Sequence, residues 1–505
     1  MDEKICTEQR TQSAPPPAKA RVTTTLDSLP AGSAGAAQQK INTKQPLPEG
    51  ITSRMLYKDI LRIGWPALVE LMLTQLTSMA DTMMVGRLGA WALSAVGLTM
   101  QPKMLLATAF MALNTGTMAL VGRYRGAGNQ KKARLVLRQG FMLNGILGLI
   151  FALIGIVFSK QLVIFMGPTE EKVLIEATKY LQVQLIGMFT LSMTSCITST
   201  LRGSGDSKTA MIYNTTANVV NVVGNYLLIY GHFGFPRLEV LGASIATVLG
   251  QFVAFLMAIR AVRKSTQYVR LEFPKGSIRP DFECIGNIAR IGVPSMVEQL
   301  AMRFGVIVFT KTVTGLGTIA YATHQVCMNI QALTFMNGQA FATSATSLVS
   351  QSLGKNRPDM ALHYSRRTQR TGMCVAICIA VFVFTCNKFV LGLYTDEAAI
   401  ITTGSSLLSM IALIQPFQSS QFILAGALRG AGDTKYTAMV TMLTVMLLRP
   451  SLAILLIKQF DMGLHGAWYA LVADQLLRTL LVFIRYRSGK WTTSFKHNAA
   501  AEVDN

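Results

Sequence analysis

Apolar residues recur along this chain in runs of about 20, and a helix of that length crosses a hydrocarbon layer about 30 Å thick. Short segments rich in Gly, Pro, Asp, Lys and Arg separate the runs. The pattern predicts an all-α integral membrane fold with twelve transmembrane helices. We expect them near residues 60–85, 91–120, 138–158, 178–200, 209–230, 241–262, 288–313, 319–349, 370–394, 402–427, 436–457 and 465–486.

The N-terminal region has a different pattern. The stretch SAPPPAKARVTTTLDSLPAGSAGAAQQK is rich in Pro, Ala, Ser and Thr and has no apolar period, so it cannot bury a core. It also lacks the basic-then-apolar order of a cleavable signal peptide, and we expect the first apolar run to stay as a transmembrane helix. The predicted organisation is a disordered cytoplasmic tail (1–55), an N-terminal six-helix lobe (56–265), a cytoplasmic linker (266–285), a C-terminal six-helix lobe (286–490) and a cytoplasmic tail (491–505).

The two halves of the chain repeat each other. RIGWPALVEL (Arg62 to Leu71) matches RIGVPSMVEQ (Arg290 to Gln299) at an offset of 228, and LGAWALSAVG lies over LGTIAYATHQ at the same offset. A register held over so long a stretch indicates an internal duplication. Each unit holds six helices, an even number, so both units enter the membrane from the same side. We therefore predict two lobes related by a pseudo-two-fold axis along the membrane normal, with the ligand path between them.

One ten-residue stretch of the repeat invites other interpretations. LRGSGDSKTA begins at Leu201 and LRGAGDTKYT begins at Leu428, and such a Gly-rich turn could bind phosphate, bind a metal or reverse the chain. A phosphate loop would need a preceding strand and the longer GxxxxGK[ST] spacing, which both copies lack. Two glycines permit a sharp reversal, and we expect Asp206 and Asp433 to cap the helices that follow. The stretch is predicted to be a turn between helices, held on the cytoplasmic side by its Arg and Lys.

The charge balance supports a membrane topology rather than a nucleic-acid partner. Only 14% of the 505 residues are charged, against roughly a quarter in soluble domains, and the net charge is +22. The basic residues gather in alternate gaps, which the positive-inside rule places in the cytoplasm. They are Arg123, Arg125, Lys131, Lys132, Arg134 and Arg138; Arg260, Arg263, Lys264, Arg270, Lys275 and Arg279; and Lys355, Arg357, Arg366, Arg367 and Arg370. We expect a multi-pass protein of a cytoplasmic (inner) membrane with both termini in the cytoplasm. The seven cysteines include no CxxC pair, so neither a disulfide framework nor a zinc site is predicted.

Polar residues inside the membrane that lack a counterpart in the other half are the functional candidates, because they are expensive to leave in lipid. The first helix carries Glu70, Thr74, Thr77 and Asp81 on one face, and their counterparts are Glu298, Met302, Gly305 and Phe309. The fifth helix carries Asn214, Asn218, Asn221 and Asn225 at the same spacing, opposite Thr441, Val445, Leu448 and Leu452. We predict that Asp81, Asn221 and Asn225 share one pocket in the outer half of the bilayer.

Three roles are open for this pocket. Burial favours the neutral form of a lone carboxyl, which can then carry a proton. The carboxylate and amide oxygens could instead hold a hard monovalent cation. Asn and Asp side chains also join helices by hydrogen bonds, which is our first interpretation of Asn214 and Asn218.

Other membrane residues are candidates for the substrate path: Glu70, Thr77, Asn218, Glu298, Arg303 and His324. A scaffold role is equally open for the two duplicated glutamates, and helix packing for His324. Arg303 and Lys311 either neutralise Glu298 or line the path. Asp474, four residues before Arg478, is predicted to form an ion pair near the cytoplasmic end.

The segments GWPALVELMLTQLTSMADTMMVGRLGAWALSAVG, LRGSGDSKTAMIYNTTANVVNVVGNYLLIYG, GTIAYATHQ and SLVSQSLGKNRP resemble the multidrug and toxin extrusion (MATE) transporters. The resemblance covers about residues 55–490. It implies two six-helix lobes around a cavity that opens alternately to each side, and export of amphipathic, often cationic, organic compounds driven by H⁺ or Na⁺. The family's coupling aspartate corresponds to Asp81, and its partners correspond to Asn221 and Asn225. Some branches have a second aspartate where this chain has Asn225, so we favour H⁺ as the coupling ion.

The predicted function is therefore secondary-active multidrug antiport by a monomer, with small amphipathic substrates and the lipid bilayer as partners, and without a cofactor, a metal or catalytic residues. The alternative is a flippase of a lipid-linked oligosaccharide or another lipid-like substrate. It would need a basic cavity, and only Lys103, Arg303 and Lys311 are available. An intramembrane enzyme is disfavoured because the five histidines are scattered and neither HExxH nor GxSxG occurs.

Overall fold

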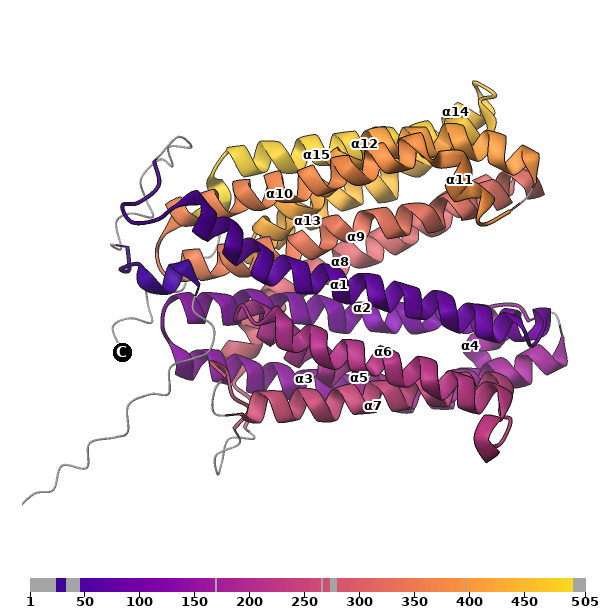
Figure 1. The fold of residues 1–505 in the computed structure, drawn as a ribbon, viewed down its shortest axis with the longest axis horizontal. Coiled ribbons are helices and arrows are strands. Elements are labelled where there is room, and N and C mark those ends of the chain that lie inside the picture. Colours follow the sequence, from indigo (N-terminus) through magenta and orange to yellow (C-terminus); the bar gives the residue numbers. More distant parts are fainter. Residues whose placement is uncertain are drawn as a thin grey trace, which may run out of the picture.

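A computed structural model describes residues 24–32, 46–168, 170–264, 267–272, 279–395 and 397–493. Over these residues the chain is helical, without strands, and the long helices form two bundles that lie side by side (Figure 1). The predicted all-α membrane fold of two six-helix lobes is confirmed.

The helices of the N-terminal lobe are α1 (Ser53–Gly86), α2 (Ala90–Gly126), α3 (Gln130–Val157), the short α4 (Ser159–Phe165), α5 (Glu171–Gly203), α6 (Ser207–Tyr230) and α7 (Glu239–Arg263). Those of the C-terminal lobe are α8 (Phe282–Thr314), α9 (Thr318–Gly354), α10 (Pro358–Thr385), the short α11 (Asn387–Gly392), α12 (Ala398–Gly430), α13 (Thr434–Thr441), α14 (Arg449–Lys458) and α15 (Gly463–Arg487). A π-helical turn, η4 (Met442–Leu448), joins α13 to α14, and the three form one span.

Nine spans in the described part of the chain are long and apolar enough to cross a membrane by length and composition alone. The remaining three of the twelve long helices are α1, α6 and α9. Helix α1 carries the predicted stripe that ends at Asp81, and α6 carries the four-asparagine stripe. The two helices that carry the unmatched polar residues, α1 and α6, are thus less apolar than the nine other spans.

The two repeated turns lie at the same end of the bundle as the segment Thr24–Gly32, and we call this end the tail side and the opposite end the far side (Figure 1). Gly205 and Gly432 have φ values of +81° and +85°, which explains the glycine in each copy. Asp206 caps α6 by accepting a hydrogen bond from the Thr209 amide at 3.1 Å, as predicted. The cap predicted for Asp433 is wrong, because its carboxylate accepts from Arg485 Nε at 2.7 Å instead.

The lobes meet at the tail side through closely packed backbones. A Cβ on Gly126 would lie 1.9 Å from the Gln351 carbonyl oxygen, and one on Gly354 would lie 1.9 Å from the Arg123 carbonyl oxygen. Gln351 Nε2 also donates to the Gly203 carbonyl at 2.9 Å. These contacts between α2 or α5 and α9 close the tail side of the interface.

The N-terminal tail departs from the prediction where it is described. Thr25–Ser28 forms a 3₁₀ turn, η1, in which the Leu26 side chain is only 2% exposed. The disorder predicted for the whole tail therefore does not hold for this segment. Near the other end, Trp491 is buried and stacks on Tyr486 at 5.5 Å. Residues 1–23, 33–45 and 494–505 of the two predicted tails lie outside the described residues.

Candidate functional site

A ladder of polar side chains joins α1 to α6. The two predicted stripes face each other in a constant register of 144 residues, and three of the four rungs are hydrogen bonds. They are Asn214 Nδ2 to Glu70 Oε1 at 2.7 Å, Asn218 Nδ2 to Thr74 Oγ1 at 3.2 Å, and Asn225 Nδ2 to Asp81 Oδ1 at 2.5 Å. Equal spacing on the two helices lets like turns lie opposite each other along the whole ladder.

The rung nearest the far side forms a connected cluster. Asn225 is fully buried and donates to both Asp81 Oδ1 and Asn221 Oδ1, the second at 2.9 Å. Asn221 in turn donates to Thr247 Oγ1 of α7 at 3.0 Å. The structure thus brings Asp81, Asn221 and Asn225 together, and adds Thr247. The Asp81 partners in this cluster are neutral amides, and a carboxyl group with such partners can exist with or without a proton.

Lys103 is a second charge near Asp81. It follows Pro102 in α2, donates to Gln184 Oε1 of α5 at 2.7 Å, and lies close enough for its ammonium to interact electrostatically with the Asp81 carboxylate. The sequence reading counted Lys103 only among the basic residues of the spans. Its pairing with Asp81 depends on the approach of α2 and α5, which neither stripe reveals.

Two further path candidates lie on the ladder. Thr77 occupies the rung opposite Asn221, but Asn221 turns away to Thr247, and none of the described side chains hydrogen-bonds the Thr77 hydroxyl. Asn218 is half-buried and bonded to Thr74. Thr77 lies on the polar stripe of α1 and Asn218 on that of α6, as their spacing predicted.

The duplicated glutamates are held by the arginines of the repeated turns. Arg202 Nη2 lies 2.7 Å from Glu70 Oε1, and Arg429 Nη1 lies 2.9 Å from Glu298 Oε1. Both carboxylates are buried, and Thr437 adds a hydrogen bond to Glu298 at 2.9 Å. Of the two roles open for these glutamates, this geometry supports the scaffold role.

The position of Asp81 carries Phe309 in the second lobe, and a different charge cluster lies beside it. Arg449 donates to Asp474 Oδ2 through Nε at 3.0 Å and also through Nη2, and its guanidinium lies 5.8 Å from the Phe309 ring. The predicted Asp474–Arg478 ion pair is present, at 3.9 Å, but it lies in the middle of α15 and not near the cytoplasmic end as predicted. All three charged side chains are almost fully buried, and together they carry one excess positive charge.

Arg449 was missed by the sequence reading. It is a charge inside the eleventh apolar run, and its counterpart at an offset of 227 is Val222. The mismatch between halves that identified Asp81 would have identified Arg449 too.

The last two path candidates lie on different surfaces. His324 is 1% exposed and packs between the rings of Phe309 and Trp468, at 5.6 Å from each, so it lies inside the C-terminal lobe. Arg303 is half-buried, and Lys311 is exposed two turns farther along α8. Among the described residues neither of these cations forms an ion pair with Glu298, which pairs with Arg429 instead.

Comparisons with known proteins point to one family. The MatE family model matches residues 66–227 and 294–455, one copy in each lobe. A protein of Thermotoga maritima described as probable multidrug resistance protein NorM is 28% identical over 448 residues, which cover 89% of this chain and 94% of that protein. An uncharacterized transporter of Bacillus subtilis, YisQ, is 26% identical over 437 residues, 86% of this chain and 94% of that protein.

Solved structures share the fold. An outward-facing multidrug resistance MATE family transporter of the MOP superfamily superposes with a TM-score of 0.81 over 89% of this chain and all of that chain, at 22% identity. A MOP superfamily transporter from Pyrococcus furiosus superposes with a TM-score of 0.80 over 87% of this chain and 96% of that chain, also at 22% identity.

Proposed function

Because the chain belongs to the MATE family, we propose that it is a secondary-active antiporter that exports amphipathic, often cationic, organic compounds in exchange for H⁺. Membership makes it a multi-pass membrane transporter rather than an enzyme. The substrate class, the coupling ion and the role of each site residue belong to the proposal.

The orientation follows from the tail-side charges. The described basic residues of the gaps predicted to be cytoplasmic lie at or after the tail-side ends of α2, α7 and α9. We place this side in the cytoplasm, with both termini, in a cytoplasmic membrane. The lobe contacts then close the cytoplasmic side, which is the arrangement that an outward-facing state requires.

One observation carries the assignment of the coupling residue. Four carboxylates lie well inside the spans: Glu70, Asp81, Glu298 and Asp474. Arginine binds three of them within 4 Å, whereas no ion pair of that length to Asp81 occurs among the described residues. A carboxylate fixed by arginine keeps its charge, while one held by a neutral amide is free to gain and lose a proton. Asp81 is therefore the carboxylate best placed to change charge during transport.

The composition of the cluster favours H⁺ over Na⁺. The charges of Asp81 and Lys103 sum to zero, and the partners Asn221, Asn225 and Thr247 are neutral. A bound Na⁺ would face no net negative charge to offset the loss of its water. Protonation needs only the carboxyl group of Asp81. We propose that a proton enters this site from the outside and that its release to the cytoplasm accompanies the return of the lobes.

The test uses purified protein in proteoliposomes with a fluorescent organic cation. Export is measured under an imposed pH gradient without Na⁺, and then under a Na⁺ gradient with the pH clamped on both sides. We expect uphill transport in the first condition and its loss in Asp81→Asn, with Asp461→Asn as the matched control because Asp461 is an exposed far-side carboxylate. Transport only in the second condition would overturn H⁺ coupling. Movement of a lipid-linked sugar without either gradient would favour the flippase.

A further inference from the structure

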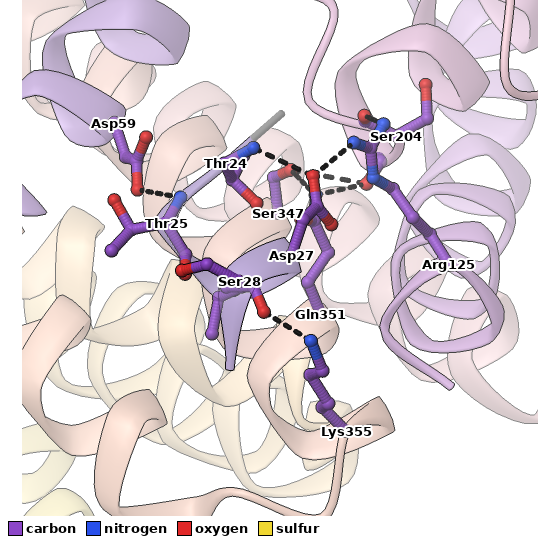
Figure 2. Close-up of polar contacts among 12 residues, drawn as sticks. Thr24, Thr25, Asp27, Ser28, Asp59, Arg125, Ser204, Ser347, Gln351 and Lys355 are labelled. Carbon is purple, nitrogen blue, oxygen red and sulfur yellow. Dashed lines mark hydrogen bonds and ion pairs between the residues drawn. The ribbon is translucent and has the colours of Figure 1, made fainter. Parts of the chain in front are cut away.

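The segment Thr24–Gly32 lies across the seam between the lobes at the tail side (Figure 2). We use the word seam for the surface formed by the tail-side ends of α1, α2 and α5 in one lobe and of α9 and α10 in the other. In Figure 2 the segment sits between Arg125 and Ser204 on one side and Lys355 on the other.

The segment binds the N-terminal lobe through two carboxylates. The Thr25 amide donates to Asp59 Oδ2 of α1 at 2.9 Å. Asp27 Oδ2 lies 3.4 Å from Arg125 Nη2 at the end of α2, and Arg125 also donates to the Ser204 carbonyl in the repeated turn. Asp59 therefore links the segment to a helix, and Asp27 links it to the turn region.

It binds the C-terminal lobe at the end of α9. Lys355 Nζ donates to the Leu26 carbonyl, and the Gly32 amide donates to the Lys355 carbonyl at 3.1 Å. The buried Leu26 side chain belongs to a hydrophobic cluster that contains Leu56 of α1 and Leu353 of α9. One apolar side chain is thus shared between the lobes.

The charges of the seam match the segment. Each lobe presents a cation, Arg125 or Lys355, and the Asp27 carboxylate interacts electrostatically with both. Burial lowers the pKa of the Lys355 ammonium from its ordinary value, while Asp27 acts in the opposite direction. Without Asp27 the two lobes would bring like charges together at the seam.

Opening of the tail side requires the end of α2 to move away from the end of α9. The segment contacts both ends, so it must leave at least one of them for the lobes to part there. We propose that the seam is a docking surface for the chain's own Thr24–Gly32 segment, which acts as a latch and holds the tail side closed. The latch rests on the alternating access of the proposed function, and it releases whenever the transporter faces the cytoplasm.

Gly32 offers a selective way to break the latch. A Cβ at this position would lie 2.2 Å from the Asn356 carbonyl oxygen, a backbone atom that cannot turn aside. Gly32→Val therefore prevents docking without changing any transmembrane helix. Ala31→Val adds similar bulk at an exposed neighbouring position and is the matched control. Asp27→Asn removes the charge shared by both lobes, and Glu49→Gln is its control at an exposed carboxylate of the same tail.

The measurement is the distance between spin labels at Lys160→Cys and Lys388→Cys, in full-length protein whose seven native cysteines are replaced. These exposed far-side positions occupy α4 and α11 and correspond to each other at an offset of 228. The labels lie far apart when the far side is open and closer when the tail side opens. We expect Gly32→Val and Asp27→Asn each to raise the short-distance fraction at least twofold, with both controls unchanged.

Distributions for Gly32→Val and Asp27→Asn that match the wild type would overturn the latch. The measurement needs neither a substrate nor a coupling ion, so its result is independent of the transport assay. A single distance in every variant and at every pH would instead count against alternating access itself. Size-exclusion profiles identify any variant that fails to fold, and the two latch variants act at different contacts.

Discussion

Arg202 Nη2 lies 2.7 Å from Glu70 Oε1, and the pair joins the repeated turn after α5 to the first helix of its lobe. The second lobe repeats the arrangement with Arg429 and Glu298. The repeated turn thus does more than reverse the chain. It supplies the cation that neutralises a buried carboxylate on the first helix of the same lobe.

Removing the arginine should destabilise the lobe more than removing the pair. Arg202→Met leaves Glu70 buried without its cation, which costs about 3–5 kcal/mol of unfolding free energy for pairs of this kind. The double variant Glu70→Gln, Arg202→Met should regain most of that loss. Thermal unfolding in detergent, followed by tryptophan fluorescence, gives the comparison. A double variant no more stable than Arg202→Met would show that Arg202 acts through other contacts.

Asn225→Asp should change the ion that drives transport. The new carboxylate would face Asp81 where the amide nitrogen now lies 2.5 Å from Oδ1. Two carboxylates at so short a distance cannot both stay ionised without a cation between them. We expect Na⁺-driven export to appear in this variant, measured in the vesicle assay with the pH clamped. Asn214→Asp is the control, because it places the same change beside Glu70, which Arg202 already neutralises. Unchanged Na⁺ dependence in Asn225→Asp would contradict the proposed role of the amide.

The C-terminal charge cluster predicts an asymmetry between two substitutions. Asp474→Asn leaves Arg449 and Arg478 buried with two uncompensated charges, and should lower the unfolding free energy by roughly 3–5 kcal/mol. Arg449→Met leaves Asp474 and Arg478 as a neutral pair and should be the milder change. The two thermal unfolding midpoints are compared in the same detergent. Equal losses, or a larger loss in Arg449→Met, would refute this account of the charge balance.

The glycine contacts at the seam predict a shift between the two states of the transporter. Gly126→Ala places a Cβ against the Gln351 carbonyl oxygen, so the lobes must separate at the tail side. We expect a larger short-distance fraction between the far-side spin labels, and the same result for Gly354→Ala. Gly86→Ala is the control, since a Cβ there meets no atom within 4 Å. If Gly126→Ala and Gly86→Ala gave the same distances, the close approach would not limit closure.

Periodicity predicted the parts of the structure that depend on one helix or on the repeat. The twelve spans and the two lobes follow from the apolar runs and the repeat. The polar stripes on α1 and α6 also predicted that Asp81, Asn221 and Asn225 lie together. The four-residue spacing likewise gave the pair of Asp474 with Arg478.

Contacts between elements that are distant in sequence could not be predicted in this way. Arg202 was interpreted as a basic residue that keeps the turn in the cytoplasm, because no sequence pattern indicates that its side chain contacts Glu70. Lys103 meets the Asp81 site only through the packing of α2 against α5. The two copies of the turn also differ in a way that their sequences do not reveal. Asp206 caps its helix, whereas Asp433 pairs with Arg485, and the first half has no arginine at the equivalent position.

The reciprocal contacts of Gly126 with Gln351 and of Gly354 with Arg123 have the form of an isologous interface, in which residue i meets j and j meets i. In a homodimer of six-helix chains, one codon would control both contacts and both copies of every buried site. Within a single chain that constraint is absent. Each half could then mutate alone, which is how one lobe carries Asp81 while the equivalent place in the other carries Phe309 beside an arginine.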